Sequence, residues 1–302
     1  MNTPEYLIYN GKFVLADSPV LQVDNRAFLY GDGLFETIRV VNGNPCFFEE
    51  HFQRLQEGMK ALKMQVSESF TADRLLENCK LLLSKNGYES GCRLRLTVFR
   101  NPGGFYCPVD NGISYTLVTR PVEFDHYHLN DSGLSLDVYS EIKKPLNRLS
   151  NFKTLNTQLF VMASLEAKEK GLDDLLILNE KGNVIESTNS NIFLVSNGVL
   201  YTPSLDEGCL AGVMRMQVIN MALACKLKVY ECALTPQRLL GADEIFVTNT
   251  AKGIQWVSRY RAKRFYHKVS DFLLNRINST LLNSDSDLPE NWQESQTPFQ
   301  DF

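Results

Sequence analysis

The stretch from Ser150 to Phe193 limits most strongly what this chain can fold into. It begins with SNFKTLNTQ, in which Lys153 precedes a helical pattern, and it ends with VIESTNSNIF, in which Glu186 leads into a polar turn. Thirty-three positions separate Lys153 from Glu186 (186 − 153), and a helix, an extended run and a tight turn lie between them. We therefore expect a mixed α/β segment that brings this lysine and this carboxylate to one small site.

Pyridoxal phosphate requires a lysine and a carboxylate that both act on the cofactor. The amine forms a Schiff base with the cofactor, and the acid keeps the ring nitrogen protonated. Donors for the phosphate are also available. Gly212 and Val213 stand at a predicted helix start, where backbone N–H groups attract anions, and Arg54 and the hydroxyls of Thr248 and Thr250 offer further hydrogen bonds. Taken one by one, these residues have commoner explanations as caps, turns and solvated charges.

Composition and charge restrict the classes of protein that remain. The chain has 302 residues, of which 44% are hydrophobic and 22% are charged, so we expect a folded protein with two domains. Its formal net charge of −4 arises from 31 basic and 35 acidic residues, which argues against a nucleic-acid or anionic-membrane partner. We find no basic leader and no long apolar run, and we expect a cytoplasmic protein.

The cysteines and histidines do not predict a metal site. The seven cysteines are scattered and never form a CxxC pair, so we expect reduced thiols packed as small apolar groups. His126 and His128 form an isolated HxH in a polar loop without further ligands at suitable spacing. We therefore expect no metal.

The first part of the chain alternates strand and helix patterns. Residues 6–23 carry short apolar runs between NG and DSP turns, and residues 34–41 alternate as another strand after a GDG turn. That GDG turn allows a close backbone approach at the mouth of a site. Helical spacing follows over residues 49–64, and a second helix is expected from a Thr71 cap to Gly87.

The next strand pattern, CRLRLTVFR, presents two arginines on one face. Side chains alternate along a strand, so Arg93 and Arg95 point to one side and Leu94 and Leu96 to the other. The cationic side either faces solvent or lines an anion-binding cavity.

We expect four segments in the chain. Residues 1–120 form an N-terminal α/β domain, 121–133 an interdomain loop, 134–283 a C-terminal domain and 284–302 a polar tail. The tail is expected to be mobile or to dock through Trp292 and Phe299.

Helices of the C-terminal domain follow from capping and spacing. The first is expected to begin at about Thr154 and the second to run from roughly Ala211 to Lys226. A short third helix is expected after the cap Thr235, with Pro236 at its first position.

The chain carries, in order, the blocks RAFLYGDGLFETIRV, EEHFQRL, FKTLN, VIESTNSNIF, LAGVMR and FVTNTA. Over roughly residues 6–280 it resembles the class IV, or fold type IV, pyridoxal-phosphate enzymes. These include branched-chain aminotransferases, D-amino-acid aminotransferases and 4-amino-4-deoxychorismate lyases. The resemblance implies a mixed α/β enzyme of two domains with pyridoxal 5′-phosphate at their interface. It also implies a homodimer.

The resemblance assigns a role to each matching position. Lys153 matches the catalytic Schiff-base lysine, Glu186 the acid at the pyridine nitrogen and Arg54 the phosphate-binding arginine. The cofactor-binding set that it implies is Arg54, Lys153, Glu186, Asn191, Gly212, Val213, Met214 and Thr250. Phe35, Arg95 and Asn249 are the candidate substrate contacts.

Substrate choice stays open at this point. Pro102 and Phe35 replace the histidine and tyrosine of D-amino-acid enzymes, and Thr157 and Gln158 stand where branched-chain enzymes have a tyrosine. Arg95 stands where the lyases have a lysine that meets the substrate carboxylate, but Phe105 replaces an arginine expected in their glycine loop.

Our first hypothesis is a lyase of the folate route that converts 4-amino-4-deoxychorismate into 4-aminobenzoate and pyruvate. The alternative is an aminotransferase of the branched-chain or D-amino-acid type that uses 2-oxoglutarate. A third hypothesis is a non-catalytic relative.

Overall fold

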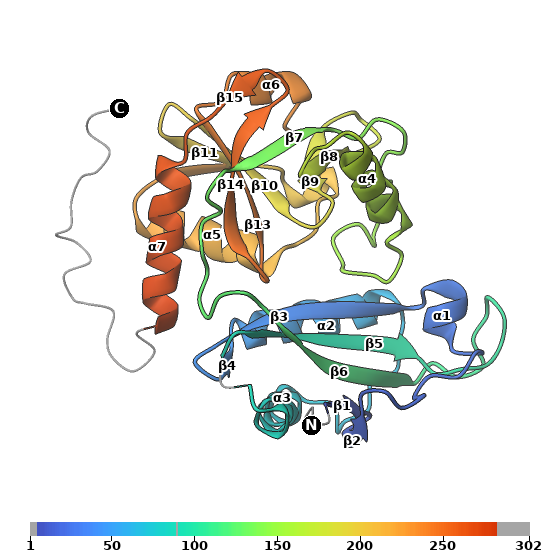
Figure 1. Cartoon of the computed structure of the whole chain (residues 1–302). Coiled ribbons are helices and arrows are strands. Elements are labelled where there is room, and N and C mark those ends of the chain that lie inside the picture. Colours follow the sequence, from blue (N-terminus) through green and yellow to red (C-terminus); the bar gives the residue numbers. More distant parts are fainter. Residues whose placement is uncertain (1–4, 89, 283–302) are drawn as a thin grey trace. The chain divides into compact units, whose positions relative to one another are not determined.

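The computed structural model describes residues 5–88 and 90–282 (Figure 1). The chain divides into unit 1, Met1–His126 with Asn151–Thr157, and unit 2, Tyr127–Ser150 with Gln158–Phe302. Residues 151–157, which the sequence analysis assigned to the second domain with the rest of 134–283, therefore belong to unit 1. The expectations for Trp292 and Phe299 lie outside the described residues.

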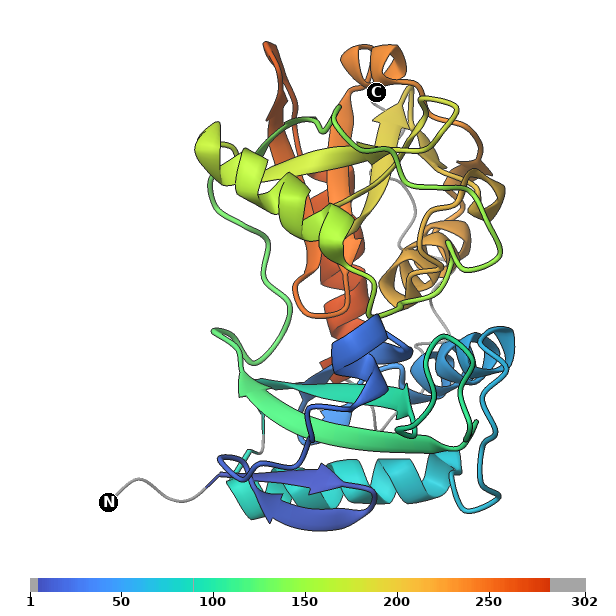
Figure 2. The same ribbon diagram turned by 90° about the vertical axis from the view of Figure 1, so that its right-hand side faces the viewer.

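Unit 1 is an antiparallel sheet with helices on one face. The sheet has the strand order β2-β1-β6-β5-β3-β4. Its elements are β1 (Tyr6–Tyr9), β2 (Lys12–Leu15), α1 (Arg26–Tyr30), β3 (Gly33–Val41), β4 (Asn44–Pro45), α2 (Phe48–Ala61), α3 (Ala72–Asn86), β5 (Cys92–Arg100) and β6 (Ile113–Pro121). Helix α2 packs on β3, and α3 packs on β1 and β6 (Figure 2).

Alternation along the strands explains this layering. Ile38 and Val40 of β3 and Leu94 and Leu96 of β5 point to the same side, where they join the buried side chains of α2 and α3. Burying these apolar groups stabilises the unit by roughly 1.5–3 kcal/mol for each fully buried side chain. The opposite side of the same strands carries polar and charged residues.

Most elements of unit 1 occur where the sequence predicts them. Thr71 caps α3 by accepting a hydrogen bond from Arg74 N at 3.4 Å, and Gly87 ends that helix with φ 71°. Residues 20–23, which were expected to continue the strand meander, form no strand. Helix α1 was not predicted, because a five-residue helix offers too few positions for a periodic pattern. Its cap is Asn25, whose Oδ1 accepts from Ala27 N at 2.9 Å.

Unit 2 is built on a second sheet, in the order β12-β11-β10-β13-β14-β7-β8-β9 with β15 beside β14. Strand β9 also pairs with β10. Six strands therefore form a closed ring, in the order β10, β13, β14, β7, β8 and β9. Its elements are β7 (Leu134–Val138), α4 (Gln158–Glu169), β8 (Asp174–Leu178), β9 (Val184–Ser187), β10 (Asn191–Ser196), β11 (Val199–Thr202), a 3-10 turn (Leu205–Glu207), α5 (Val213–Ala224), β12 (Lys228–Glu231), α6 (Pro236–Leu240), β13 (Glu244–Asn249), β14 (Gly253–Tyr260), β15 (Lys263–Arg264) and α7 (Lys268–Leu282).

The closed ring explains the long buried runs in unit 2. Strands β9 and β13 are buried at almost every position, because helices cover the outer side of a ring whose inner side is also filled. Helix α4 packs on β8, whereas α5 and α7 pack on β13 (Figure 1).

Of two helix starts predicted in unit 2, the structure differs at one and confirms the other. Helix α4 begins at Gln158 rather than near Thr154, because residues 153–155 pair with β3 instead. The predicted helix after Thr235 is confirmed as α6, and Thr235 Oγ1 accepts from Arg238 N at 3.4 Å.

The cysteines occur as free thiols in the described part of the chain. Cys46, Cys79, Cys92 and Cys209 are buried as predicted, whereas Cys107 is exposed.

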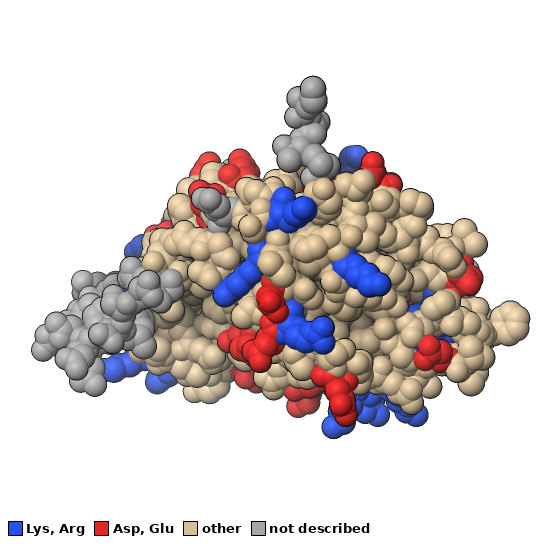
Figure 3. Space-filling model, turned by 90° about the horizontal axis from the view of Figure 1, so that it is seen from below, with Lys and Arg blue, Asp and Glu red and all other residues tan. Residues whose placement is uncertain are grey.

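Within residues 5–88 and 90–282, no helix is long and apolar enough to cross a bilayer. The same residues hold no cluster of three or more His, Cys, Asp or Glu side chains placed to bind a metal. Acidic and basic side chains are mixed on the face drawn in Figure 3, in keeping with the small net charge.

Candidate functional site

Lys153 lies on a short extended segment that is hydrogen-bonded to the start of β3. Its carbonyl oxygen accepts from Phe35 N at 2.9 Å, and Leu155 N donates to Gly33 O at 3.0 Å. Thr154 forms the antiparallel bridge to Leu34 between these bonds. The lysine is therefore fixed by backbone pairing to unit 1.

Gly33 makes this pairing possible. A Cβ atom at this position would lie 2.5 Å from Val98 O and 2.7 Å from Leu155 Cδ1, so no larger residue fits without moving the backbone. Gly31 has φ 63°, and a Cβ there would lie 2.8 Å from Asn156 Oδ1. The predicted close approach at GDG thus occurs, and the segment that approaches is the one that carries Lys153.

We expect Gly33→Ala to displace the Lys153 segment and to destabilise the protein by roughly 1–3 kcal/mol through overpacking. The matched control is Gly241→Ala, where the nearest atom to a new Cβ is Arg238 O at 3.7 Å. Urea denaturation of both variants measures the difference. Equal stability of the two variants would contradict the role of Gly33.

The Phe35 ring brings together two cationic groups. Lys153 Nζ lies 4.4 Å from the ring centroid and Arg95 Cζ lies 3.8 Å from it. Phe35 and Arg95 were predicted as substrate contacts, and unit 1 places both beside Lys153. A negative group bound at Arg95 would lie near the amine of Lys153.

Arg54 belongs to a buried ion cluster on the helix-covered side of the sheet. Its Nε donates to Glu36 Oε1 at 2.8 Å, and its Nη2 donates to Glu36 Oε2. His51 Nδ1 donates to the same Oε2 at 2.6 Å. Because two parallel bonds hold the guanidinium, Arg54 is fixed in one orientation.

The electrostatics of this cluster keep Glu36 ionised. Burial alone would raise the pKa of Glu36, but the charge of Arg54 and the hydrogen bond from His51 outweigh burial and lower the pKa to about 2. Burial lowers the pKa of His51 despite the adjacent carboxylate. A neutral His51 that donates through Nδ1 is the consequence, and among the described residues its buried Nε2 has no partner.

Glu186, on β9 in unit 2, is held by two donors. Lys144 Nζ lies 2.6 Å from Oε1, and Leu210 N donates to Oε2 at 2.9 Å. The side chain is buried. Each carboxylate oxygen retains a second lone pair, so the group can still accept a hydrogen bond from a protonated ring nitrogen.

Asn191 stands beside Glu186 in the sheet. It pairs with Glu186 on β9 and with Thr248 on β13, so one row crosses these three neighbouring strands. Its Nδ2 donates to Leu210 O at 2.8 Å. A Cβ at Gly212 would collide with Asn191 Oδ1, so this position requires glycine.

Helix α5 begins immediately after that contact. Gly212 is its N-cap and supplies no side-chain hydrogen bond, and the first turn carries no acidic residue. The N–H groups of Val213 and Met214 therefore lie at the positive end of helix α5, and no capping side chain accepts a hydrogen bond from them. A helix start of this kind can bind an anion. Thr248 adds a buried hydroxyl that has no partner among the described residues.

Thr250 and Asn249 shape the loop after β13. Thr250 O accepts from the Tyr127 hydroxyl at 2.9 Å. Asn249 Nδ2 donates to Ser190 Oγ at 2.8 Å, and its Oδ1 accepts from Ala251 N and Lys252 N. Asn249, a predicted substrate contact, thus holds together two loops of unit 2.

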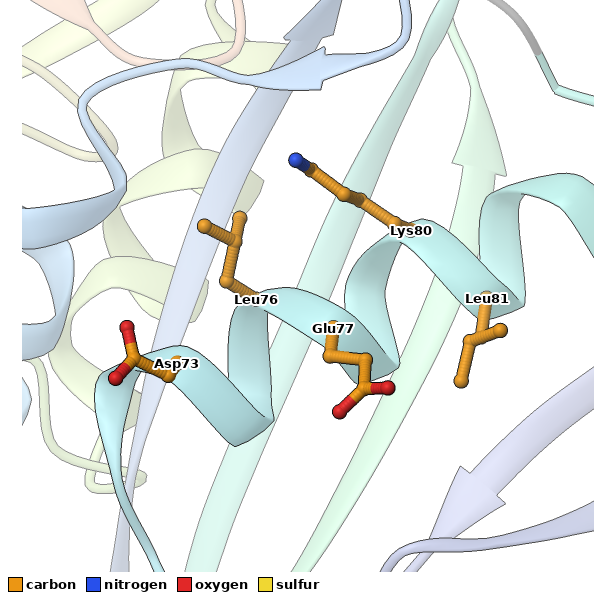
Figure 4. A pocket seen from close by; sticks show the side chains of 5 residues that line it. All are labelled: Asp73, Leu76, Glu77, Lys80 and Leu81. Atoms are coloured by element: carbon orange, nitrogen blue, oxygen red, sulfur yellow. The ribbon is translucent and has the colours of Figure 1, made fainter.

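Among the described residues, unit 1 has a cavity beside the Lys153 segment and a hollow along α3. A cavity of about 260 Å³ borders the Lys153 segment; Arg26 and Arg100 line it, and each donates Nε to Asp32 Oδ2 at 2.9 Å. A hollow of about 420 Å³ is lined by Asp73, Leu76, Glu77, Lys80 and Leu81, which all project from α3 (Figure 4). None of the residues lining the α3 hollow is a candidate site residue.

Several residues that contact the candidate site residues were not predicted from the sequence. Glu36, His51 and Lys144 were not predicted because their role depends on partners far along the chain. The HxxR spacing of His51 and Arg54, one helical turn apart, was the signal that could have linked those two residues.

Comparisons with known proteins agree with the resemblance in the sequence. A model of the family described as Amino-transferase class IV matches residues 33–260. The chain is 33% identical to a putative branched-chain-amino-acid aminotransferase of Methanocaldococcus jannaschii, over 81% of this chain and 84% of the relative. It is 29% identical to the aminodeoxychorismate lyase of Bacillus subtilis, over 81% and 83% of the two chains.

A solved structure matches almost the whole chain. It is a T.th. branched-chain amino acid aminotransferase in complex with N-(5′-phosphopyridoxyl)-L-glutamate, with a TM-score of 0.83 and 26% identity. The match covers 97% of this chain and 98% of that chain.

Each unit carries groups of the chemical types that pyridoxal 5′-phosphate requires. Unit 1 has the lysine amine that matches the cofactor's aldehyde. Unit 2 has a buried carboxylate that matches the ring nitrogen, and it has the Thr248 hydroxyl and the helix start at Gly212, which match the phosphate. The findings favour an enzyme over a non-catalytic relative. The chain belongs to the class IV aminotransferases and is an enzyme that uses pyridoxal 5′-phosphate.

Proposed function

We propose that this enzyme is a 4-amino-4-deoxychorismate lyase, which forms 4-aminobenzoate and pyruvate. The observation that carries the proposal is the stacking of Arg95 on the Phe35 ring that also meets Lys153. A carboxylate held at Arg95 would bring the amine of the same small molecule to the reacting lysine. The 29% identity to the Bacillus subtilis lyase supports this assignment.

The proposal gives each candidate residue a task. Pyridoxal phosphate supplies an electron sink for the carbon that bears the substrate amine. Lys153 would hold the cofactor through its amine and would carry a proton to or from the substrate carbon that bears the amine. Glu186 would accept a hydrogen bond from the protonated ring nitrogen, and Lys144 holds that carboxylate in place. Arg54, Thr250 and the N–H groups of Val213 and Met214 would hold the phosphate, with Gly212 leaving the space and Asn191 orienting its loop.

An aminotransferase acting on an α-amino acid is the second candidate. The 33% identity to the Methanocaldococcus jannaschii relative favours it. Lys153 and Arg95 could also receive an α-amino acid, because it too presents an amine and a carboxylate.

A pair of assays separates the two candidates. The purified enzyme is given 4-amino-4-deoxychorismate, and pyruvate and 4-aminobenzoate are measured. In parallel it is given leucine or D-alanine with 2-oxoglutarate, and the absorbance of the cofactor is followed for conversion to pyridoxamine phosphate. The lyase proposal expects release of both products in the first assay. Turnover only in the second would contradict it.

We further propose that the enzyme is a cytoplasmic homodimer. Unit 1 exposes three large aromatic rings, Phe28, Phe105 and Tyr106, by 76%, 84% and 90%. Such exposure of apolar rings is unusual on the surface of a monomer. The free thiols fit a reducing compartment. Sedimentation velocity is expected to give the mass of two chains for the parent and a larger monomer fraction for Phe28→Asp. A monomeric parent would contradict the proposal.

A further inference from the structure

The side of the unit 1 sheet that carries Phe35 also carries a row of arginines. Arg93 on β5 is paired directly with Arg39 on β3 and with Arg120 on β6. Arg95 lies two residues from Arg93 on the same side of β5. Like charges placed directly opposite each other destabilise a sheet, so this row has an energetic cost that other interactions must offset.

Partners inside the chain account for two of these arginines. Arg39 Nη2 donates to the carbonyl oxygens of Phe124 and His126. Arg120 forms an ion pair with Glu5 at 3.8 Å. These contacts give Arg39 and Arg120 a structural role.

Arg93 and Arg95 are different. Among the described residues neither forms an ion pair with a carboxylate, and Arg95 stacks on the ring of Phe35. Burial, and after it the charge of Arg93, lowers the pKa of Arg95. The chain therefore presents adjacent guanidinium groups that repel each other and that an anion would stabilise.

Lys153, Arg95 and Arg93 follow one another along this side of the sheet. Lys153 and Arg95 meet the same ring of Phe35, and Arg93 lies one strand repeat beyond Arg95, at a Cα separation of about 7 Å. An amine at Lys153 and a carboxylate at Arg95 would leave Arg93 available to a second, more distant anionic group.

We propose that Arg93 binds a second carboxylate of the substrate, so that the site selects amines bearing two carboxylates over those bearing one. The inference rests on the proposed function and names the substrate class that the site takes. Each arginine can bind a carboxylate through two parallel N–H···O hydrogen bonds. The pair therefore recognises two carboxylates and the distance between them.

Two aromatic probes of equal shape test the proposal. Isophthalate carries two carboxylates, and 3-carbamoylbenzoate replaces one of them by an amide. Isothermal titration calorimetry of the holoenzyme is expected to show that isophthalate binds roughly tenfold more tightly, the effect of one added charge-assisted contact. In Arg93→Gln the two probes are expected to bind alike, and Arg93→Lys is expected to restore part of the preference.

Arg120→Gln is the matched control, because it removes the same charge from the same row. This variant is expected to keep the preference for isophthalate. A parent that does not distinguish the probes, an Arg93→Gln variant that still does, or an equal loss in Arg120→Gln would overturn the proposal.

The outcome is independent of the lyase assay. A preference for isophthalate that depends on Arg93, without pyruvate release, would reject the lyase and leave an enzyme for another amine with two carboxylates. Pyruvate release from an enzyme that shows no preference for isophthalate would reject the role of Arg93 and leave the lyase proposal standing.

Discussion

Lys153→Ala is expected to abolish turnover. Loss of the proton carrier alone lowers kcat by roughly 10²- to 10⁴-fold, and loss of the amine that attaches the cofactor adds to this effect. Steady-state kinetics with the substrate identified by the paired assays measures the loss. The fold should survive, because the backbone hydrogen bond between Lys153 O and Phe35 N does not depend on the lysine side chain.

Lys168→Ala, on helix α4, is the control for that experiment. Lys168 has the same side chain on an exposed position and is expected to leave kcat unchanged. A Lys153→Ala enzyme that kept the parent's rate would refute the assignment of the catalytic residue.

Glu36→Gln is expected to have the second largest effect. The substitution keeps the shape of the side chain but leaves the Arg54 guanidinium buried without its counter-charge. Breaking a buried ion pair in this way costs roughly 3–5 kcal/mol of stability. Because Arg54 is also a proposed phosphate ligand, the dissociation constant of pyridoxal phosphate should rise. Thermal unfolding and cofactor titration measure the two effects.

The control is Glu57→Gln, which removes an exposed carboxylate from the same helix as Arg54. It should change neither stability nor cofactor affinity. If Glu36→Gln bound the cofactor as tightly as Glu57→Gln, the buried cluster would have no part in orienting Arg54.

The pH dependence of stability gives an independent check on Glu36. Its pKa falls from 4.5 to about 2 in the folded chain, so the folded state prefers the ionised carboxylate. The contribution is complete above pH 4.5 and is lost as the pH falls towards 2. The stability difference between the parent and Glu36→Gln should therefore shrink over that range. A constant difference would contradict the linkage.

Most of the fold was predictable because its signals are local. The alternation in β5 and the Thr71 cap of α3 depend on neighbouring residues, and both are found as expected. The residues after Lys153 were predicted to begin a helix at about Thr154, since nothing local to them reveals that Gly33 leaves space for an extended segment beside β3. Pairing between segments that are far apart in the sequence overrides local preference there.

The candidate site divides in the same way. Lys153, Glu186 and Arg54 were identified because they stand in motifs that resemble a known family. Lys144, Glu36 and His51 act through contacts with those residues, and a partner that is distant in sequence leaves no mark on the local pattern. Arg93 was recognised as part of a cationic side, but its position opposite Arg39 and Arg120 is visible only once the strands are paired.

The central claim is that the cofactor is attached at Lys153. The most direct test is to reduce the holoenzyme with borohydride, digest it and locate the phosphopyridoxyl group by mass spectrometry. We predict that the label lies on the peptide containing Lys153. A label on Lys144 or on any other lysine, or an unlabelled protein that retains activity, would contradict the account.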